Sequence, residues 1–145
     1  MVADVHGNAD LLRAALAEWG ALSDPEYRGF DVLQVGDLMN VVLESEEGDL
    51  RCLELARMYD VTVLVGNHEQ PLLGGGAFSG CYVHPSVRDL YTAAIGVGTV
   101  VPCAVVHGAL VTHAGLADGL LDEDPTSAEG AHDVLWETWL SAPAD

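Results

Sequence analysis

The sequence predicts an α/β fold in a single domain spanning residues 1–145. Short Val- and Leu-rich runs alternate along the chain with longer stretches whose apolar residues recur at helical spacing. The length suits one ordinary domain, and 50% apolar residues are enough to build a hydrophobic core. We find no internal repeat and no shift in composition that would mark a domain boundary.

The first half of the chain contains three predicted strands and two predicted helices. The strands are short apolar runs at residues 2–3, 32–35 and 61–65. The first helix is expected from Asn8, which suits an N-cap, to Gly20, which suits a C-terminal stop. The second is expected from Ser45 to about Tyr59, because Ser45 and its acidic neighbours favour a helix N-terminus.

The second half begins with a glycine-rich surface segment from Gly74 to Gly80 and a helix over residues 87–95. Residues 90–117 carry no Asp, Glu, Lys or Arg, but several Gly residues and Pro102 interrupt them. This stretch therefore predicts two buried strands joined by a tight turn at His107-Gly108, and it does not predict a membrane span. A last helix is expected from Asp124-Pro125 to about Leu140.

The charge balance excludes several classes of function. The chain has 23 acidic residues and 5 basic ones, all of them Arg, and its formal net charge is −18. Binding to nucleic acid or to an anionic membrane needs a basic surface, so neither partner is expected. So large an excess of negative charge also repels itself. We therefore expect the stability of the fold to rise with added salt.

The cysteine pattern and the N-terminus predict a cytoplasmic protein. Cys52, Cys81 and Cys103 form no CxxC motif and no dense framework, which is typical of reduced thiols. The residues that follow Met1 include no basic region and no apolar core of an export signal.

Side chains of the kinds that bind metals follow four of the predicted strands. They are Asp4 and His6, then Asp37, then Asn67 and His68, and finally His113. Open α/β sheets place their ligands at the carboxyl ends of the strands. Carboxylate, imidazole and amide groups together suit Mn, Fe or Zn, and no Cys joins the set.

These residues lie in motifs that resemble, in order, the signature blocks of calcineurin-like metallophosphoesterases. The blocks are Asp4-Val5-His6-Gly7-Asn8, Gly36-Asp37, Gly66-Asn67-His68-Glu69 and His113-Ala114-Gly115-Leu116. They look most like those of phosphoprotein phosphatases and bacterial diadenosine tetraphosphate hydrolases. The resemblance covers residues 2 to about 116. It implies the layered αββα sandwich of the metallo-dependent phosphatases.

The resemblance also implies a site that holds two divalent metal ions. Asp4 and His6 would bind the first ion, Asp37 would bridge both, and Asn67 and His113 would bind the second. The ions would be Mn, Fe or Zn, with Mn the choice expected in vitro.

Three further residues receive roles by the same resemblance. His68 would protonate the leaving oxygen as general acid. Glu69 would support the local geometry without touching substrate. The second block continues Leu38-Met39-Asn40-Val41, where the family has an Asp that orients the catalytic His and then a phosphate-binding Arg. Asn40 can still hydrogen-bond His68, but it cannot stabilise a charged imidazole as a carboxylate would.

Other departures concern phosphate binding and the ends of the chain. Val41 cannot clamp phosphate, and Arg13 or Arg88 would have to substitute for the missing Arg. The family supplies one more metal ligand from a late Gly-His pair, for which His132 is the alternative here. Only three residues precede Asp4, where the family has a full strand. Relative to the family, both ends are therefore expected to be clipped.

Two functions are consistent with these observations. The first is hydrolysis of a phosphate ester by a metal-activated hydroxide, acting on a phosphorylated small molecule, a nucleotide polyphosphate or a phosphoserine or phosphothreonine protein. The alternative is a catalytically degenerate relative that keeps the fold and acts as a binding module. A plain acidic α/β domain is the third reading. The sequence leaves the oligomeric state open.

Overall fold

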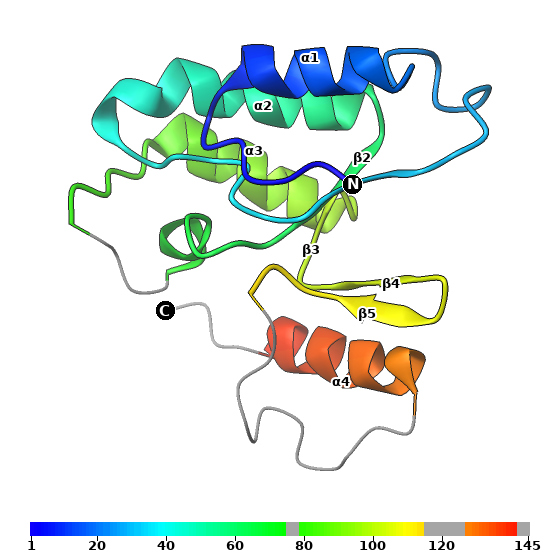
Figure 1. The fold of residues 1–145 in the computed structure, drawn as a ribbon. Helices are drawn as coiled ribbons and strands as arrows, with labels where there is room; N and C mark the ends of the chain where they lie inside the picture. The colour runs from blue at the N-terminus through cyan, green and yellow to red at the C-terminus, as the bar shows by residue number, and fades with distance from the viewer. Residues whose placement is uncertain (75–78, 115–126, 142–145) are drawn as a thin grey trace.

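The computed structural model describes residues 1–74, 79–114 and 127–141, and in them the chain forms a mixed α/β fold (Figure 1). The helices are α1 (Ala9–Glu18), α2 (Glu46–Met58), α3 (Pro85–Gly96) and α4 (Ala128–Ser141), with short 3₁₀ turns η1 (Leu43–Ser45) and η2 (Gln70–Leu73). The strands are β1 (Val32–Gln34), β2 (Val61–Leu64), β3 (Val100–Val101), β4 (Ala104–Val106) and β5 (Ala109–Val111).

The strands form two separate sheets. β1, β2 and β3 pair in parallel in that order, with Val32 opposite Val61 and Val63 opposite Val100. β4 and β5 form an antiparallel hairpin. The apolar run after Thr99 therefore divides between the two sheets. The break falls at Pro102, which has no N–H to donate to a ladder.

The predicted first strand is reduced to a single bridge between Val2 and Gln34. The N–H of Val2 donates to the carbonyl of Leu33 at 2.8 Å, and the N–H of Val35 donates to the carbonyl of Val2 at 2.9 Å. Even this one step of pairing runs parallel to β1. It carries the chain along the edge of the parallel sheet and into the loop that contains Asp4 and His6.

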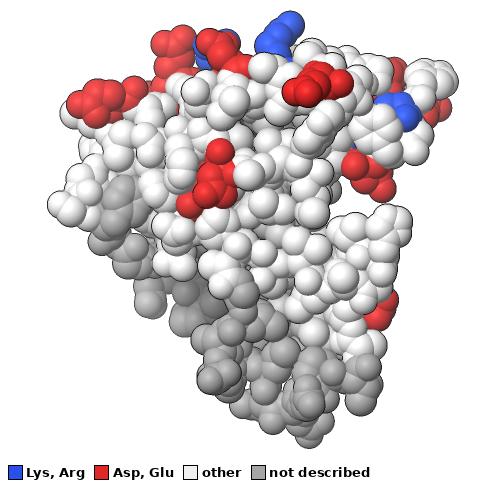
Figure 2. Space-filling model, viewed as in Figure 1, with Lys and Arg blue, Asp and Glu red and all other residues white. Residues whose placement is uncertain are grey.

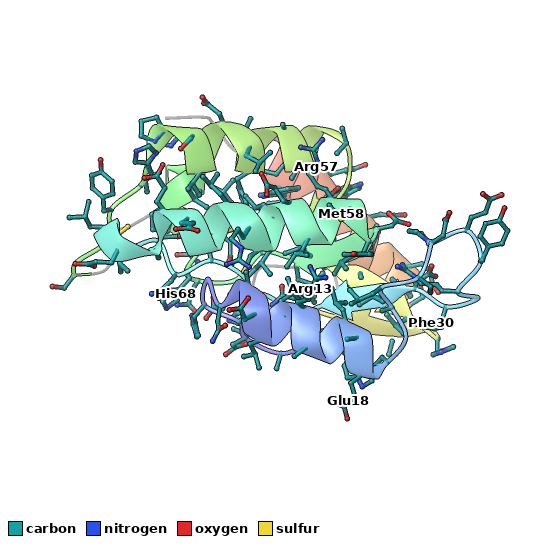
Figure 3. The ribbon with its side chains drawn as sticks, turned by 90° about the horizontal axis from the view of Figure 1, so that it is seen from above. Arg13, Glu18, Phe30, Arg57, Met58 and His68 are labelled. Atoms are coloured by element: carbon teal, nitrogen blue, oxygen red, sulfur yellow. The ribbon has the colours of Figure 1, made fainter. Side chains whose placement is uncertain are left out.

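The elements are stacked in layers (Figure 1). Helices α1, α2 and α3 lie side by side on one face of the parallel sheet, with α2 in contact with both of the others (Figures 1 and 3). The β4–β5 hairpin lies on the other side, and α4 packs against it. The main core fills the space between the three helices and the parallel sheet, with buried residues such as Leu12, Leu16, Leu53, Ala56, Val61, Val63, Val87 and Tyr91.

Local sequence explains where the helices begin and end. The side chain of Asn8 accepts the N–H of Leu11 at 3.0 Å, as expected of an N-cap, and Gly20 has a φ of 69° just beyond the end of α1. Helix α3 starts two residues before the predicted position, because Pro85 suits a first helical turn and His84 caps it. Ser45 precedes α2 as predicted, but its hydroxyl makes no cap hydrogen bond.

The hairpin turn at His107-Gly108 is confirmed, but the strands that it joins, predicted to be buried, are only partly buried, and Ala109 is exposed. Both turn residues have positive φ angles, 51° and 75°, which is the backbone of a two-residue turn that matches the twist of paired strands. The start predicted for the last helix, Asp124-Pro125, lies outside the described residues, as do residues 75–78 of the glycine-rich segment. In the described part of the chain, α4 begins at Ala128.

None of the helices within the described residues has the length and apolar character needed to cross a membrane.

Cys52, Cys81 and Cys103 are free thiols, and Cys52 and Cys103 are buried. Burial raises the pKa of Cys52 to about 12, with the nearby Asp49 adding to the effect. Acidic side chains are prominent over the helical layer in Figure 2.

Candidate metal centre

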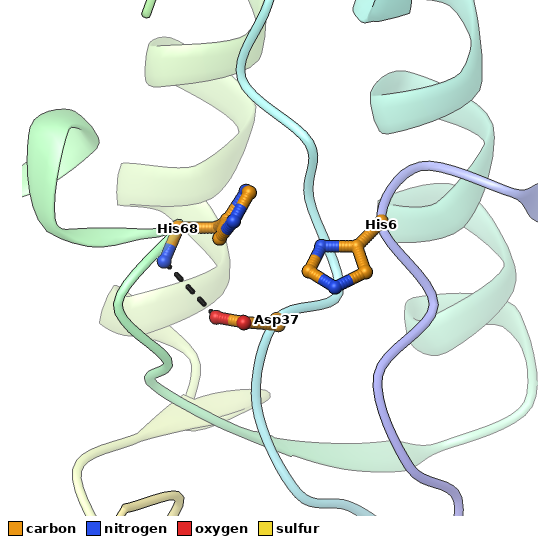
Figure 4. A group of neighbouring side chains, drawn as sticks. All are labelled: His6, Asp37 and His68. Atoms are coloured by element: carbon orange, nitrogen blue, oxygen red, sulfur yellow. Dashed lines mark hydrogen bonds between the residues drawn. The ribbon is translucent and has the colours of Figure 1, made fainter. Parts of the chain in front are cut away.

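Three loops bring His6, Asp37 and His68 together (Figure 4). Each offers one ligand atom, and these atoms all lie within 4.8 Å of one another. His6 follows the Val2 bridge, Asp37 follows β1 and His68 follows β2, so the group forms at the carboxyl end of the parallel sheet. The rings of His6 and His68 meet edge to face, with 4.5 Å between their centroids.

Asp37 is the residue that ties these loops to one another. Its main-chain carbonyl accepts the N–H groups of Val5 at 3.0 Å and His6 at 2.9 Å. Its carboxylate Oδ1 accepts the N–H of His68 at 3.0 Å (Figure 4). The φ of Asp37 is 53°, in the left-handed region that non-glycine residues rarely adopt. The residue is 5% exposed, so this conformation is held by buried contacts on both sides.

His113, which follows β5 of the other sheet, brings a fourth side chain to the site. Its ring Nδ1–H donates to the carbonyl of Val35 at 2.7 Å. Because a carbonyl only accepts, this bond places the proton on Nδ1 and directs Nε2 into the site. Nε2 lies 3.5 Å from Oδ1 of Asp37 and 3.3 Å from Oδ1 of Asn67. With neutral His113, three acceptor atoms therefore converge, and a cation would satisfy all of them.

The glycines of the motifs make room for this convergence. A Cβ at Gly66 would lie 2.2 Å from Oδ1 of Asp37, and a Cβ at Gly36 would lie 2.3 Å from Nδ1 of His113. Gly36 also has a φ of 99°. Any side chain at either position would therefore push a ligand group out of place.

Glu69 braces the site from behind. It is fully buried, and its Oε2 accepts the N–H groups of Asp37 at 3.1 Å and Gly66 at 2.7 Å. Its Oε1 accepts the N–H of Met39 at 2.8 Å. Burial raises the pKa of Glu69 to about 7, although the three N–H groups act in the opposite direction. These bonds join the end of β1 to the end of β2 directly behind Asp37.

Asp49 is a second buried carboxylate, one that the motifs did not single out. It is 1% exposed, and its Oδ1 accepts the N–H of Asn40 at 2.8 Å. Its Oδ2 accepts the N–H of Val41 at 3.0 Å and the hydroxyl of Ser45 at 2.7 Å. Asp49 thus fixes the peptide between Asn40 and Val41, where Val41 has a φ of 54°.

A signal for Asp49 was present in the sequence. Asp49, Cys52, Leu53 and Ala56 recur at the spacing of one helical face, and the last three are the apolar face of α2. A charged residue on that face has to be buried with a partner. The acidic run just before it made Asp49 look like one more surface charge.

Asn40 contacts His68 through its main chain. The ring Nδ1–H of His68 donates to the main-chain carbonyl of Asn40 at 3.2 Å. The prediction from the sequence placed this contact on the Asn40 side-chain amide. Because the carbonyl only accepts, His68 carries its proton on Nδ1 whatever side chain stands at position 40.

The remaining predicted residues are less closely gathered. Asp4 is exposed and lies outside the group formed by His6, Asp37 and His68. Val41 is 1% exposed, so core packing fills the position at which the resemblance would have an Arg. The guanidinium of Arg88 donates to the carbonyl of Pro71 at 3.4 Å. His132 lies on α4 and its ring contacts Asp133 at 3.3 Å.

The chain matches no family model, no curated protein and no solved structure. What the site can do chemically therefore has to be judged from its donors. Imidazole nitrogens, one buried carboxylate and an amide oxygen suit a divalent ion such as Mn, Fe or Zn. The residues present fit such an ion at this place.

Proposed function

We propose that the chain is a metal-dependent phosphoesterase, a hydrolase that cleaves phosphate esters. The observation that carries this proposal is the convergence of His6, Asp37 and His68, with the Nε2 of His113 turned toward Asp37. Four loops from two sheets supply these groups, and two buried carboxylates brace them. Such a concentration of supporting bonds is expected where geometry must be held for binding or catalysis.

In this proposal Asp4, His6 and Asp37 hold one divalent ion, and Asp37, Asn67 and His113 hold a second. When bound, such ions lower the pKa of water and offset the negative charge of a phosphoryl group. The buried carboxylate of Asp37 would belong to both sets, because it lies near His6 and near Nε2 of His113. Exposed Asp4 would join the first set by turning toward His6.

His68 acts in this proposal as the general acid. Its Nδ1–H is already engaged by the carbonyl of Asn40, so the ring is held in one orientation. The opposite nitrogen, Nε2, is then the atom that would hold a proton and pass it to the leaving oxygen. Because a carbonyl is neutral, the protonated ring gains less stabilisation here than beside a carboxylate.

The finer points of fold, substrate and location belong to the same proposal. The order of layers, with helices, parallel sheet, hairpin and α4, supports the αββα sandwich of metallo-dependent phosphatases. The substrate would be a phosphorylated small molecule, a nucleotide or a phosphoprotein. The net charge of −18 repels such anions at long range, so bound cations must supply the local attraction. Free thiols are consistent with a cytoplasmic protein.

The test is hydrolysis of para-nitrophenyl phosphate by the pure protein loaded with Mn. We expect turnover, and Asp37→Asn should lower it by more than about 100-fold. Loss of a residue that merely supports a ligand typically costs about 10- to 100-fold. Asp10→Asn is the matched control, because its carboxylate is exposed on α1. Full activity in Asp37→Asn would eliminate the proposed site.

A second candidate function is a metal-binding protein of the same fold that lacks catalysis. Two observations favour it, namely the neutral partner of His68 and the buried Val41 at the position of the phosphate-binding Arg. Metal stoichiometry separates the two candidates. Two ions per chain with turnover support the phosphoesterase, whereas one weakly bound ion without turnover supports the binding protein.

A further inference from the structure

Gln34 is the last residue of β1, and its polar side chain is fully buried. Its Nε2 donates to the carbonyl of Gly36 at 2.6 Å and to the carbonyl of Ala3 at 3.3 Å. Its Oε1 accepts the N–H of Gly36 at 3.0 Å. Both N–H groups of the carboxamide therefore have acceptors, as a buried amide requires. All three bonds end on main chain that leads into the metal centre.

The two carbonyls that Gln34 binds belong to the peptides in front of two aspartates. The carbonyl of Gly36 is part of the peptide that joins Gly36 to Asp37. The carbonyl of Ala3 is part of the peptide that joins Ala3 to Asp4. One carboxamide thus connects the two chain segments that carry the proposed ligands of the first ion.

The peptide between Gly36 and Asp37 is held at both ends by buried side chains. Gln34 donates to its carbonyl, and Glu69 accepts its N–H at 3.1 Å. These bonds fix a stretch where φ is positive at two successive residues, 99° at Gly36 and 53° at Asp37. A residue other than glycine keeps this backbone only where the surrounding contacts impose it. Gln34 and Glu69 together therefore determine where the Asp37 carboxylate points.

The same turn carries the acceptor of His113. Val35 lies between Gln34 and Gly36, inside the ring that the Gln34 side chain closes with the main chain of Gly36. The carbonyl of Val35 accepts the Nδ1–H of His113 at 2.7 Å, and Nε2 of that ring lies 3.5 Å from Oδ1 of Asp37. A change in this turn is therefore expected to move side chains of both proposed ion sets.

We propose that Gln34 is a positioning residue of the metal centre, whose buried carboxamide sets the arrangement of the segments that carry Asp4, Asp37 and His113. It acts through main-chain bonds, without contacting the bound ions. This inference rests on the proposed metal-binding function, since it concerns how that site is held. If the bonds of Gln34 favour metal binding, the bound metal must by reciprocity strengthen those bonds by the same factor.

The first test is Gln34→Met, which keeps the length of the side chain and removes all three bonds. Titration calorimetry with Mn should show an affinity at least about tenfold lower than in the parent protein, because supporting contacts of a metal site typically contribute about 10- to 100-fold. Val61→Ala is the matched control, because Val61 is buried opposite Val32 at the amino end of the parallel sheet.

The control should lower the melting temperature by leaving a cavity, while its affinity for Mn stays unchanged. Circular dichroism checks that both variants fold. Unchanged Mn affinity in a folded Gln34→Met protein would overturn the proposal, and so would an equal loss of affinity in Val61→Ala.

A second measurement needs no bound ion. In the metal-free parent protein we expect a slowly exchanging NMR signal from the Nδ1–H of His113, because the carbonyl of Val35 accepts it. In Gln34→Met this proton should exchange with water at least about tenfold faster, whereas Val61→Ala should leave its rate unchanged. Should the parent protein bind no Mn, the metal-binding function fails, and this rate alone decides whether Gln34 sets the turn. An equal rate in Gln34→Met would overturn the positioning role.

Should Gln34→Met not fold, the parent protein still decides the outcome. Zn fits the same donors and is diamagnetic, so NMR signals stay sharp when it binds. Saturation with Zn should slow the hydrogen exchange of the Gln34 carboxamide protons at least about tenfold, as reciprocity requires. Exchange of those protons at the same rate with and without bound Zn would overturn the proposal.

Discussion

The two ends of the parallel sheet are built in opposite ways. At the carboxyl end, polar side chains converge and two buried carboxylates, Glu69 and Asp49, accept main-chain N–H groups from the surrounding loops. At the amino end, Val32 and Leu33 of β1 border a cavity whose lining is more apolar than polar. Among the described residues, Val2 pairs with the edge of β1 beside that cavity through a single bridge.

This difference shows that the buried carboxylates lie at one end of the parallel sheet. A buried carboxylate is tolerable only when hydrogen bonds replace its lost hydration, so each one fixes the geometry around it. The carboxyl end is therefore expected to be rigid and intolerant of substitution. The amino end borders a cavity, and it should tolerate change at little cost. Four predictions probe this contrast, and a fifth concerns the surface charge.

The largest effect is expected from Glu69→Ala. The substitution leaves three buried N–H groups, those of Asp37, Met39 and Gly66, without their acceptor. Each unsatisfied group costs about 1–3 kcal/mol, so the free energy of unfolding should fall by about 4 kcal/mol. Urea denaturation measures it. Glu69→Gln keeps one acceptor oxygen and should lose less, and equal losses would contradict this account.

Glu69 should also make stability depend on pH in the metal-free protein. Burial raises its pKa from 4.5 to about 7, so the folded state holds a proton that the unfolded state has already released between these values. The stabilisation is complete below pH 4.5 and is lost as the pH rises toward 7. Thermal melts across this range should show a falling melting temperature. The slope should be smaller in Glu69→Gln, and a rising slope in the parent protein would refute the assignment.

Gly66, at the carboxyl end of the sheet, can be compared with Gly96 at the end of α3. Gly66→Ala would place a Cβ 2.2 Å from Oδ1 of Asp37, so the carboxylate has to shift. We expect a loss of about 1–3 kcal/mol together with weaker metal binding. Gly96→Ala is the control, because no atom lies within 4 Å of its Cβ at the end of α3. That variant should be neutral or stabilised by up to about 1 kcal/mol. Calorimetric titration with Mn and urea denaturation report both effects.

A matched pair of Asp variants compares the two ends directly. Asp49→Asn replaces one of two acceptor oxygens by a donor that faces a buried N–H, and should cost about 1–3 kcal/mol. It should also loosen the Asn40 carbonyl, so the NMR signal of the His68 Nδ1–H should broaden. Asp31→Asn, at the exposed amino end, should change stability by less than about 0.5 kcal/mol. Similar losses in both variants would erase the proposed contrast.

The smallest effect is expected from salt. The net charge of −18 repels itself, and mobile ions screen that repulsion within a Debye length of about 10 Å at 0.1 M. The melting temperature should therefore rise as NaCl is added. A melting temperature that stays flat from low to molar salt would show that the surface charge is already compensated.

The sequence was sufficient for the class of fold and for most elements. The mixed α/β architecture, Asn8 at the start of α1 and the turn at His107-Gly108 were all predicted, because each depends on local spacing or local backbone preference. The bridge at Val2 was overestimated as a strand. The sheet to which His113 belongs was not predictable, because pairing partners are chosen by packing between distant parts of the chain.

The supporting contacts of the site were predicted only in part. Glu69 entered through its motif, whereas Asp49 was hidden among exposed acidic neighbours although it lies on the buried face of α2. The contact between His68 and Asn40 uses a main-chain oxygen, and no residue letter encodes the direction of a carbonyl. The aim of that carbonyl depends on Asp49, which lies in a different element.

The main-chain contact at Asn40 has a consequence for how this chain can change over generations. Every amino acid carries the same carbonyl, so a point mutation at position 40 leaves the acceptor for His68 in place as long as the backbone keeps its course. The contact is instead sensitive to mutation of Asp49, whose carboxylate holds the backbone at Asn40 and Val41 in place. Drift at position 40 can thus be silent for the histidine, while a change in the middle of a helix can disable it.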